Sequence, residues 1–141
     1  MISKKAKYAL KALKLLAENF ESKKPLLIAD IAVKENIPKK FLETILLEMR
    51  NNGILHSQKG KGGGYQLRLP PQDITLAKVI RVIDGPIAPL PCVSLYFYGK
   101  CGDCISEEAC SIRHIMEKIR DANLSIYEHT TVLDLVKIVV N

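Results

Sequence analysis

The sequence contains no tryptophan, and its aromatic fraction is only 6%. It also has no apolar run near the roughly 18 to 20 residues that span a bilayer, so we expect no membrane partner. The first ten residues, MISKKAKYAL, lack the apolar core of a signal peptide, which predicts a cytoplasmic protein. Hydrophobic residues are nevertheless 48% of the chain and charged residues 26%, which excludes a disordered chain. The 141 residues are enough for one ordinary core.

Acidic residues are scarce in the first half of the chain. Residues 1–70 hold 14 Lys and Arg against 6 Asp and Glu, a net charge of +8, whereas residues 71–141 hold 7 against 9, a net charge of −2. Cysteine is absent from the first 91 residues, and all four cysteines follow. The basic half predicts a polyanionic partner, and the cysteine-bearing half predicts a second task. Because cytosolic thiols stay reduced, metal or redox chemistry is favoured over structural disulfides.

Apolar spacing predicts a mainly α-helical fold. The first helix is expected over residues 3–20, with Ser3 as its N-cap, because no Gly or Pro interrupts this stretch. Residues 28–35 and 38–53 are expected to form two shorter helices joined by a brief turn, which makes a candidate helix-turn-helix. The buried stripe of the second of these helices is expected to be Leu42, Ile45, Leu46 and Met49.

A small β-hairpin is predicted next. Two alternating segments, residues 54–58 and 65–69, flank a basic, glycine-rich turn, and a hairpin after a helix-turn-helix is typical of a wing. Residues 1–71 are therefore expected to be a winged helix-turn-helix DNA-binding region. Residues 72–141 are expected to complete one compact unit, with helices at 76–83, 111–128 and 132–140 and a cysteine loop at 92–110.

Lysine runs usually form a solvated face, but two clusters here occupy the positions that a winged helix turns toward DNA. One cluster begins the second helix of the motif and the other lies at the wing tip. Lys39 and Glu43 are spaced to pair at i and i+4, which leaves Lys40 and Thr44 as the better candidates for base contacts. The candidate DNA-binding residues are Lys39, Lys40, Phe41, Thr44, Lys59, Lys61, Gly62, Gly63, Gly64 and Tyr65.

Four segments together resemble a known family of transcriptional regulators: KYALKAL, LETILLEMRNNGIL, GKGGGYQL and ITLAKVIRVIDG. They are similar to the IscR/NsrR/CymR-type, or Rrf-two, regulators, and the resemblance covers nearly the whole chain. It implies a winged-helix homodimer, not an enzyme, that binds a pseudo-palindromic site in double-stranded promoter DNA. One departure is Pro38, where family members often carry a serine that caps the recognition helix.

The four cysteines follow the pattern Cys92-x8-Cys101-x2-Cys104-x5-Cys110. The residues alone leave four alternatives: packed free thiols, a zinc site, an iron–sulfur cluster, or a thiol–disulfide switch of Cys101 and Cys104. Structural zinc sites typically show two close cysteine pairs, and here only Cys101 and Cys104 form one. Iron–sulfur thiolates tolerate loop spacings of this kind.

The family resemblance favours the cluster, since cluster-binding members are similar in having three loop cysteines and a fourth ligand of variable identity. It implies an iron–sulfur cluster, expected to be 2Fe–2S, that senses redox, iron–sulfur or nitric oxide status, with zinc as the alternative. The three thiolate ligands are expected to be Cys92, Cys104 and Cys110. Some members carry a histidine ligand three residues after the last cysteine, but Arg113 occupies that place here. The candidates for the fourth ligand are Cys101 and His114.

The predicted helix over residues 111–128 is expected to form the dimer. Its apolar residues repeat at helical spacing, and the seam candidates are Ile112, Ile115, Ile119 and Leu124. A metal- or thiol-dependent enzyme is the less favoured alternative. Only Asp103, Glu107, Glu108 and His114 lie near the cysteines in sequence, and the basic half would then have no role.

Overall fold

A computed structural model of the protein describes residues 1–138. Helices and one antiparallel hairpin follow one another along this part of the chain, as predicted for a winged helix-turn-helix with a long C-terminal helix. Three single-turn 3₁₀ helices, Phe20–Ser22, Pro71–Asp73 and Pro91–Val93, join them. The elements are α1 (Lys4–Glu18), α2 (Ile28–Glu35), α3 (Lys39–Asn51), β1 (Leu55–Gln58), β2 (Gly64–Leu67), α4 (Leu76–Ile83), α5 (Ser111–His129) and α6 (Val132–Lys137).

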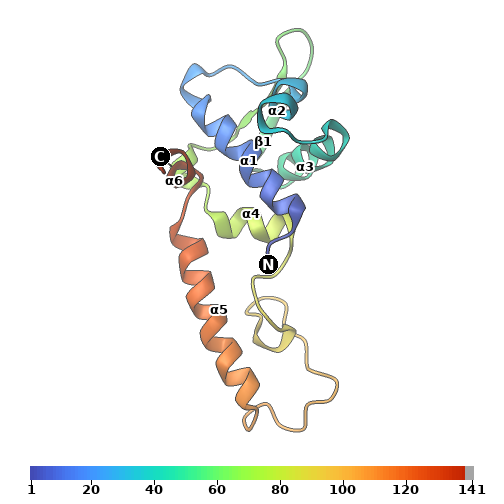
Figure 1. The fold of residues 1–141 in the computed structure, drawn as a ribbon, viewed down its shortest axis with the longest axis vertical. Helices are drawn as coiled ribbons and strands as arrows, with labels where there is room; N and C mark the ends of the chain where they lie inside the picture. The colour runs from blue at the N-terminus through green and yellow to red at the C-terminus, as the bar shows by residue number, and fades with distance from the viewer. Residues whose placement is uncertain (139–141) are drawn as a thin grey trace.

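Helix α1 forms the centre of the N-terminal body and packs against α2, α3, α4 and α6 (Figure 1). It begins where predicted because the Ser3 hydroxyl accepts a hydrogen bond from the backbone N–H of Ala6 at 2.9 Å. The Ser3 backbone N–H in turn donates to Asp84 Oδ2 at 2.9 Å, which ties the start of α1 to the end of α4. Leu13 is fully buried on the inner face, a position where truncation to alanine typically costs about 2–5 kcal/mol.

The helix-turn-helix is built around Asn36. This residue adopts a left-handed conformation (φ +53°) that ends α2, and the next residue, Ile37, is buried and donates its N–H to Ala32 O at 2.9 Å. Helix α3 follows Pro38, which offers no side-chain cap. The predicted stripe of α3 is confirmed as fully buried at Leu42, Ile45, Leu46 and Met49.

The wing is the β1–β2 hairpin, in which Ser57 pairs with Tyr65. Its tip turns through Gly60 and Gly62, whose φ angles of +89° and +78° favour glycine. Tyr65 also forms an isolated antiparallel bridge with Leu26, in the segment just before α2. The wing is thereby fastened to the helix-turn-helix.

Helix α4 spans the predicted residues, and the Thr75 hydroxyl caps it by accepting from the Lys78 N–H at 3.2 Å. Helix α5 runs one residue beyond the predicted end, and α6 begins with a capping box of Thr131 and Asp134. The last helix was expected to reach residue 140. It ends at Lys137, and residues 139–140 lie outside the described part of the chain.

Helix α5 extends away from the N-terminal body and carries the cysteine-bearing loop at its far end (Figure 1). The wing and the helix-turn-helix lie at the opposite end of the long axis. Over residues 1–138, the helices are too short or too polar to cross a membrane.

Candidate functional site

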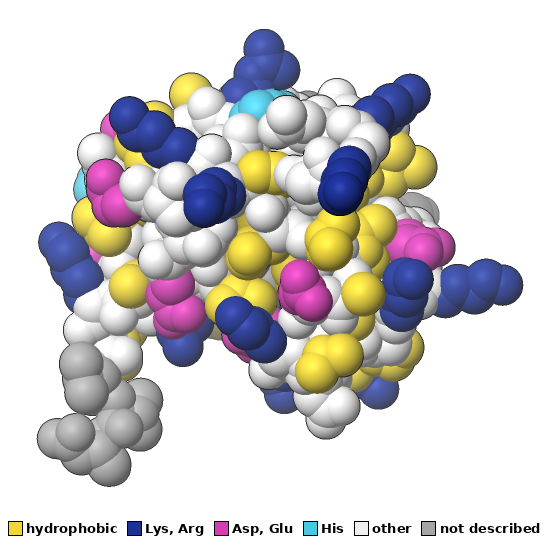
Figure 2. All heavy atoms as spheres, turned by 90° about the horizontal axis from the view of Figure 1, so that it is seen from above, with side chains coloured by type: hydrophobic (Ala, Val, Ile, Leu, Met, Phe, Trp, Pro, Cys, Tyr) yellow, Lys and Arg dark blue, Asp and Glu magenta, His cyan; other side chains and the backbone are white. Residues whose placement is uncertain are grey.

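The predicted DNA-binding residues gather at the end of the molecule formed by α2, α3 and the wing. Seen from that end, Lys and Arg side chains project from the rim and from the face itself, with hydrophobic side chains and some Asp and Glu side chains between them (Figure 2). Lys39, Lys40 and Thr44 are exposed at the start of α3, and Lys59 and Lys61 are exposed at the wing tip. Two basic edges therefore flank the exposed side of α3.

The anticipated ion pair of Lys39 with Glu43 is not formed. Other pairs at this spacing do form, such as Lys14 with Glu18 at 3.5 Å, but within residues 1–138 no carboxylate lies within ion-pair distance of Lys39 or Lys40. Both ammonium groups at the start of α3 thus keep their charge available to a polyanion.

Four of the predicted contact residues are held within the fold. Phe41 is half-buried and packs edge-on against Tyr8, with ring centroids 5.6 Å apart and planes at 75°. A Cβ on Gly63 or Gly64 would overlap backbone carbonyls of neighbouring segments, and Tyr65 is engaged in its bridge. These residues shape the end of the molecule formed by α2, α3 and the wing, whereas the lysines, Thr44 and Gly62 are exposed on it.

All four cysteines line a single pocket, here called the cysteine pocket, with a volume of about 640 Å³. Cys92 comes from the Pro91–Val93 turn and is buried, Cys101 is exposed, and Cys104 and Cys110 are half-buried. A turn in which the Cys104 N–H donates to Cys101 O at 3.2 Å brings these two residues together. Asp103, Ile112 and Arg113 are among the other residues that line it.

Cys110 is also the N-cap of α5. Its Sγ accepts a hydrogen bond from the Arg113 backbone N–H at 3.4 Å, so the sulfur lies at the positive end of the helix dipole. The sequence did not predict this cap, because Ser, Thr, Asp and Asn are the residues that normally mark the position.

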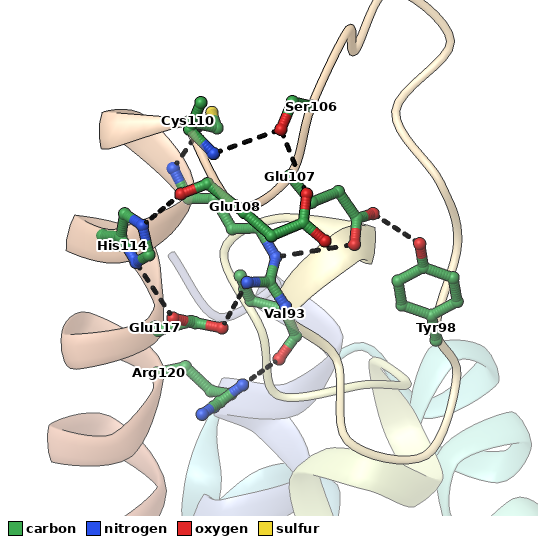
Figure 3. Close-up of polar contacts among 11 residues, drawn as sticks. Val93, Tyr98, Ser106, Glu107, Glu108, Cys110, His114, Glu117 and Arg120 are labelled. Carbon is green, nitrogen blue, oxygen red and sulfur yellow. Dashed lines mark hydrogen bonds and ion pairs between the residues drawn. The ribbon is translucent and has the colours of Figure 1, made fainter.

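His114 lies outside the cysteine pocket. Its Nε2 is 2.9 Å from the backbone carbonyl of Glu108, and its Nδ1 is 3.7 Å from Glu117 Oε2 (Figure 3). Both ring nitrogens therefore face protein groups, and the imidazole does not contribute to the pocket wall. Of the two candidates for a fourth ligand, the structure brings Cys101 to the other cysteines and leaves His114 apart.

A polar network closes the cysteine loop against α5. The Tyr98 hydroxyl donates to Glu107 across the two ends of the segment that bears Cys101 and Cys104 (Figure 3). Arg113 Nη1 lies 2.9 Å from Glu117 Oε1, and its Nε lies 3.9 Å from Glu107 Oε2. The sequence placed these charged residues near the cysteines, but their pairing depends on how the loop folds back.

The exposed thiol of Cys101 donates to Asp103 Oδ1 at 2.9 Å. This hydrogen bond raises the pKa of Cys101 and lowers the pKa of Asp103. Burial, followed by the neighbouring Cys110, raises the pKa of Cys104. Both groups are therefore protonated thiols at neutral pH, and a metal that binds them must release protons.

Within residues 1–138, no three His, Cys, Asp or Glu side chains are gathered closely enough to hold a single metal ion. The four thiols share one pocket without converging on one point. Thiols are nevertheless the donors that iron–sulfur clusters use, so the chemistry of the set fits such a group.

Apolar side chains on α5 face solvent in the single chain. Ile112, Ile115 and Ile119 are 61%, 53% and 41% exposed, and Ile126 is 67% exposed. Leu124, predicted with them, is only 8% exposed, because it packs within its own chain against the segment that follows α4. Three of the four predicted seam residues are thus available to a partner.

Comparison with known proteins agrees with the family resemblance seen in the sequence. Residues 2–138 match the Rrf2 family, described as an iron-dependent transcriptional regulator. A Rhodobacter capsulatus protein named as an rrf2-like HTH-type transcriptional regulator is 43% identical over 137 residues, which are 96% of this chain and 91% of that protein.

Solved structures show the same architecture. CymR, the global cysteine regulator of Bacillus subtilis, superposes with a TM-score of 0.79 at 31% identity, covering 97% of this chain and 96% of that one. T. potens IscR, at 24% identity, shares the fold with a TM-score of 0.75 over 97% of this chain and 86% of that one. The protein is therefore a DNA-binding transcriptional regulator rather than an enzyme, and it belongs to the Rrf2 family.

Proposed function

We propose that the protein is a homodimeric regulator that binds a pseudo-palindromic promoter site and carries an iron–sulfur cluster, 2Fe–2S, in the cysteine pocket. The observation that carries the cluster assignment is the gathering of all four cysteines on one pocket. When bound, such a cluster supplies one-electron redox chemistry and reactivity toward oxidants and nitric oxide. The regulator would then respond to redox or iron–sulfur status.

Cys92, Cys104 and Cys110 are the first three ligands of this proposal, and Cys101 is the fourth. Cys101 lines the pocket, whereas His114 is held by Glu108 and Glu117 outside it. As a ligand, His114 would have to leave its contacts with Glu108 and Glu117 and turn into the pocket, whereas Cys101 is already on the pocket wall and loses only its hydrogen bond to Asp103. A set of four thiolates is the commonest ligand set of 2Fe–2S clusters.

A single zinc ion is the alternative occupant. Tetrahedral zinc needs four donors about 2.3 Å from one point. Structural zinc sites typically show two close cysteine pairs, and this chain has only Cys101 and Cys104 as such a pair, which disfavours zinc. The raised pKa values of Cys101 and Cys104 argue in turn against a metal-free thiol switch, which needs a reactive thiolate.

The DNA-binding mode follows from the exposed side chains. The start of α3, with Lys40 and Thr44, is suited to base edges in the major groove, and Lys59 and Lys61 are suited to phosphates or the adjacent minor groove. A dimer formed through the exposed isoleucines of α5 would require half-sites about 34 Å apart or a multiple of it. Because the proposed function requires access to promoter DNA, we expect the protein to be cytoplasmic.

Coupling between the two halves must cross the length of the molecule, since the cysteine loop and the wing lie at opposite ends (Figure 1). Arg120 on α5 donates to the carbonyl of Val93, next to Cys92, at 2.7 Å. Arg81 on α4 pairs with Glu128 on α5 at 3.3 Å, and α4 packs against α3. Occupation of the pocket could bias α3 through this chain of contacts by about 1–3 kcal/mol.

The test is an anaerobic purification of the full chain, followed by visible spectroscopy and analysis of iron, sulfide and zinc. The expected result is a coloured protein with stoichiometric iron and sulfide, and an affinity for a cognate promoter duplex that changes between the holo, apo and oxidised forms. Zinc without iron after reconstitution would overturn the cluster assignment. Equal affinity in all three forms would overturn the sensing role.

A further inference from the structure

Two of the four proposed ligands lie on a stretch of chain with few contacts of its own. Residues 100–105 carry Cys101 and Cys104, and apart from Cys104 every residue of the stretch is exposed. Within residues 1–138, the hydrogen bonds of this stretch join only its own members: the Cys104 N–H donates to Cys101 O, and the Cys101 thiol donates to Asp103. The position of the two thiols therefore depends on how the ends of the stretch are held.

Each end of the stretch is anchored beside another proposed ligand. The Gly99 N–H donates to Pro91 O at 3.1 Å, next to Cys92. At the other end, the backbone carbonyl of Glu107 accepts from the Cys110 N–H at 3.3 Å, at the start of α5. The stretch thus connects two ligands that are fixed by the fold on either side of it.

One side-chain hydrogen bond, here called the loop clamp, joins the two ends. The Tyr98 hydroxyl donates to Glu107 Oε1 and closes the stretch into a loop (Figure 3). Glu107 Oε2 lies 3.9 Å from Arg113 Nε, and Arg113 Nη1 lies 2.9 Å from Glu117 Oε1, so α5 directs the acceptor. The side chain of Glu107 is only 23% exposed, which limits competition from water for this hydrogen bond.

We propose that the loop clamp is a positioning contact for the cysteine pocket, which holds the loop with Cys101 and Cys104 in place for binding of the cluster. The inference rests on the proposed function, because it concerns the ligands of that cluster. Neither Tyr98 nor Glu107 lines the pocket, so both act through the cysteines that they position. Because its ends are fixed, the loop has fewer conformations to lose when its thiols bind a common group.

The clamp is tested first in the metal-free full chain under reducing conditions. Tyr98→Phe removes the donor hydroxyl and keeps the ring. Release of the loop should expose the half-buried Cys104, and we expect its alkylation to become about fivefold faster, the factor typical of one hydrogen bond. Cys101 is exposed already and should keep its rate. Tyr96→Phe is the matched control, since it removes a hydroxyl from an exposed ring that keeps its contact with Arg81, and we expect wild-type rates.

The second measurement uses the anaerobically reconstituted protein and follows loss of the cluster to an iron chelator by visible absorption. We expect Tyr98→Phe and Glu107→Ala each to lose the cluster about fivefold faster, with the thermal unfolding of the helices unchanged. The double variant should be no faster than either single variant, because both remove the same contact. Glu107→Gln keeps an oxygen that can accept from Tyr98, so it should retain most of the wild-type cluster lifetime.

A wild-type cluster lifetime in Tyr98→Phe, or an equal loss in Tyr96→Phe, would overturn the positioning role. Additive losses in the double variant would do the same, because the two residues would then act separately. A wild-type alkylation rate at Cys104 in Tyr98→Phe would show that the clamp does not hold the loop. A wild-type chain that takes up no iron or sulfide would instead overturn the proposed function, and the alkylation rates, which need no metal, would still decide whether the clamp holds the loop.

Discussion

Leu26 and Tyr65 exchange both of their backbone hydrogen bonds, at 2.9 and 2.8 Å, and so join the wing to the segment that precedes α2. Gly64 makes this exchange possible. Its φ of +138° is reserved for glycine, and a Cβ there would overlap the carbonyl oxygen of Leu26. The hairpin is thus held in one orientation relative to the helix-turn-helix.

Gly64→Ala is expected to lower the free energy of unfolding by more than about 2 kcal/mol, because strain and backbone overlap act together. Gly62→Ala is the matched control at the wing tip. Its φ is +78° but the space around it is open, so we expect a loss of about 1–2 kcal/mol. Urea unfolding measures both values. Equal losses in the two variants would show that the contact with Leu26 does not matter.

Two lysines are predicted to contribute differently to DNA binding. Lys59→Ala, at the wing tip, should weaken binding about equally for cognate and unrelated duplexes and reduce the salt slope by about 2, one for each protomer of the dimer. Lys40→Ala, at the start of α3, should lose more affinity for the cognate duplex and so relax base preference. Titrations of both duplexes at several salt concentrations separate the two effects. The same loss of selectivity in both variants would contradict the assigned geometry.

Local signals explain why so much of the fold could be predicted. Helix α4 lies where expected because its cap, Thr75, and its stop at Gly85 are encoded beside it. The bridge between Leu26 and Tyr65 joins residues far apart in sequence, so no local pattern indicates it. For the cysteines, the family resemblance rather than the spacing led to the expected ligands Cys92, Cys104 and Cys110, and it left the choice between Cys101 and His114 open. The polar surroundings of the pocket depend on how the loop folds back, so no local pattern indicates them.

For two site residues, helical spacing alone does not predict what surrounds the side chain. Leu124 continues the apolar spacing of α5, but the spacing cannot say whether the chain itself or a partner covers it, and here the chain does. His114 lies one turn after Cys110 in sequence terms, yet its ring turns to Glu108 and Glu117. In both cases the loop that folds back on α5 decides the outcome.

The fourth ligand is tested by a pair of substitutions. Cys101→Ser should reduce cluster content after anaerobic reconstitution and shift the electron paramagnetic resonance of the reduced cluster, because a soft thiolate is replaced by an oxygen donor. His114→Gln should leave both readouts as in the wild type, since the ring does not line the pocket. Wild-type cluster content and an unchanged resonance in Cys101→Ser, with loss of the cluster in His114→Gln, would exclude Cys101 as the fourth ligand.

The pKa of Cys101 predicts slow alkylation of the metal-free protein. The hydrogen bond to Asp103 raises this pKa, so the reactive thiolate is scarce at neutral pH and the rate should climb only as pH rises through the raised value. Asp103→Ala removes the acceptor, lowers the pKa toward its ordinary value and should accelerate alkylation of Cys101 at pH 8. Peptide mass spectrometry follows each cysteine, with Cys92 as an internal reference. An unchanged rate at Cys101 would contradict this account.

The dimer seam is tested on α5. Ile115→Glu and Ile119→Glu place charges on side chains that are exposed in the single chain, so the fold of a monomer should tolerate them. In a dimer the same charges would be buried without partners, which is strongly unfavourable, and we expect sedimentation to show monomers that retain their helical circular dichroism. Affinity for a two-half-site operator should fall with dimerisation, while affinity for a single half-site changes little.

Leu124→Ala supplies the contrast for this prediction. Leu124 is covered by its own chain, so truncation should lower the free energy of unfolding by about 2–5 kcal/mol without dissociating the protein at concentrations well above the dimer Kd. If Ile115→Glu and Ile119→Glu sedimented as the wild type does, the isoleucine face of α5 would not be the seam. If Leu124→Ala alone produced monomers, the interface would instead run through the segment that Leu124 supports.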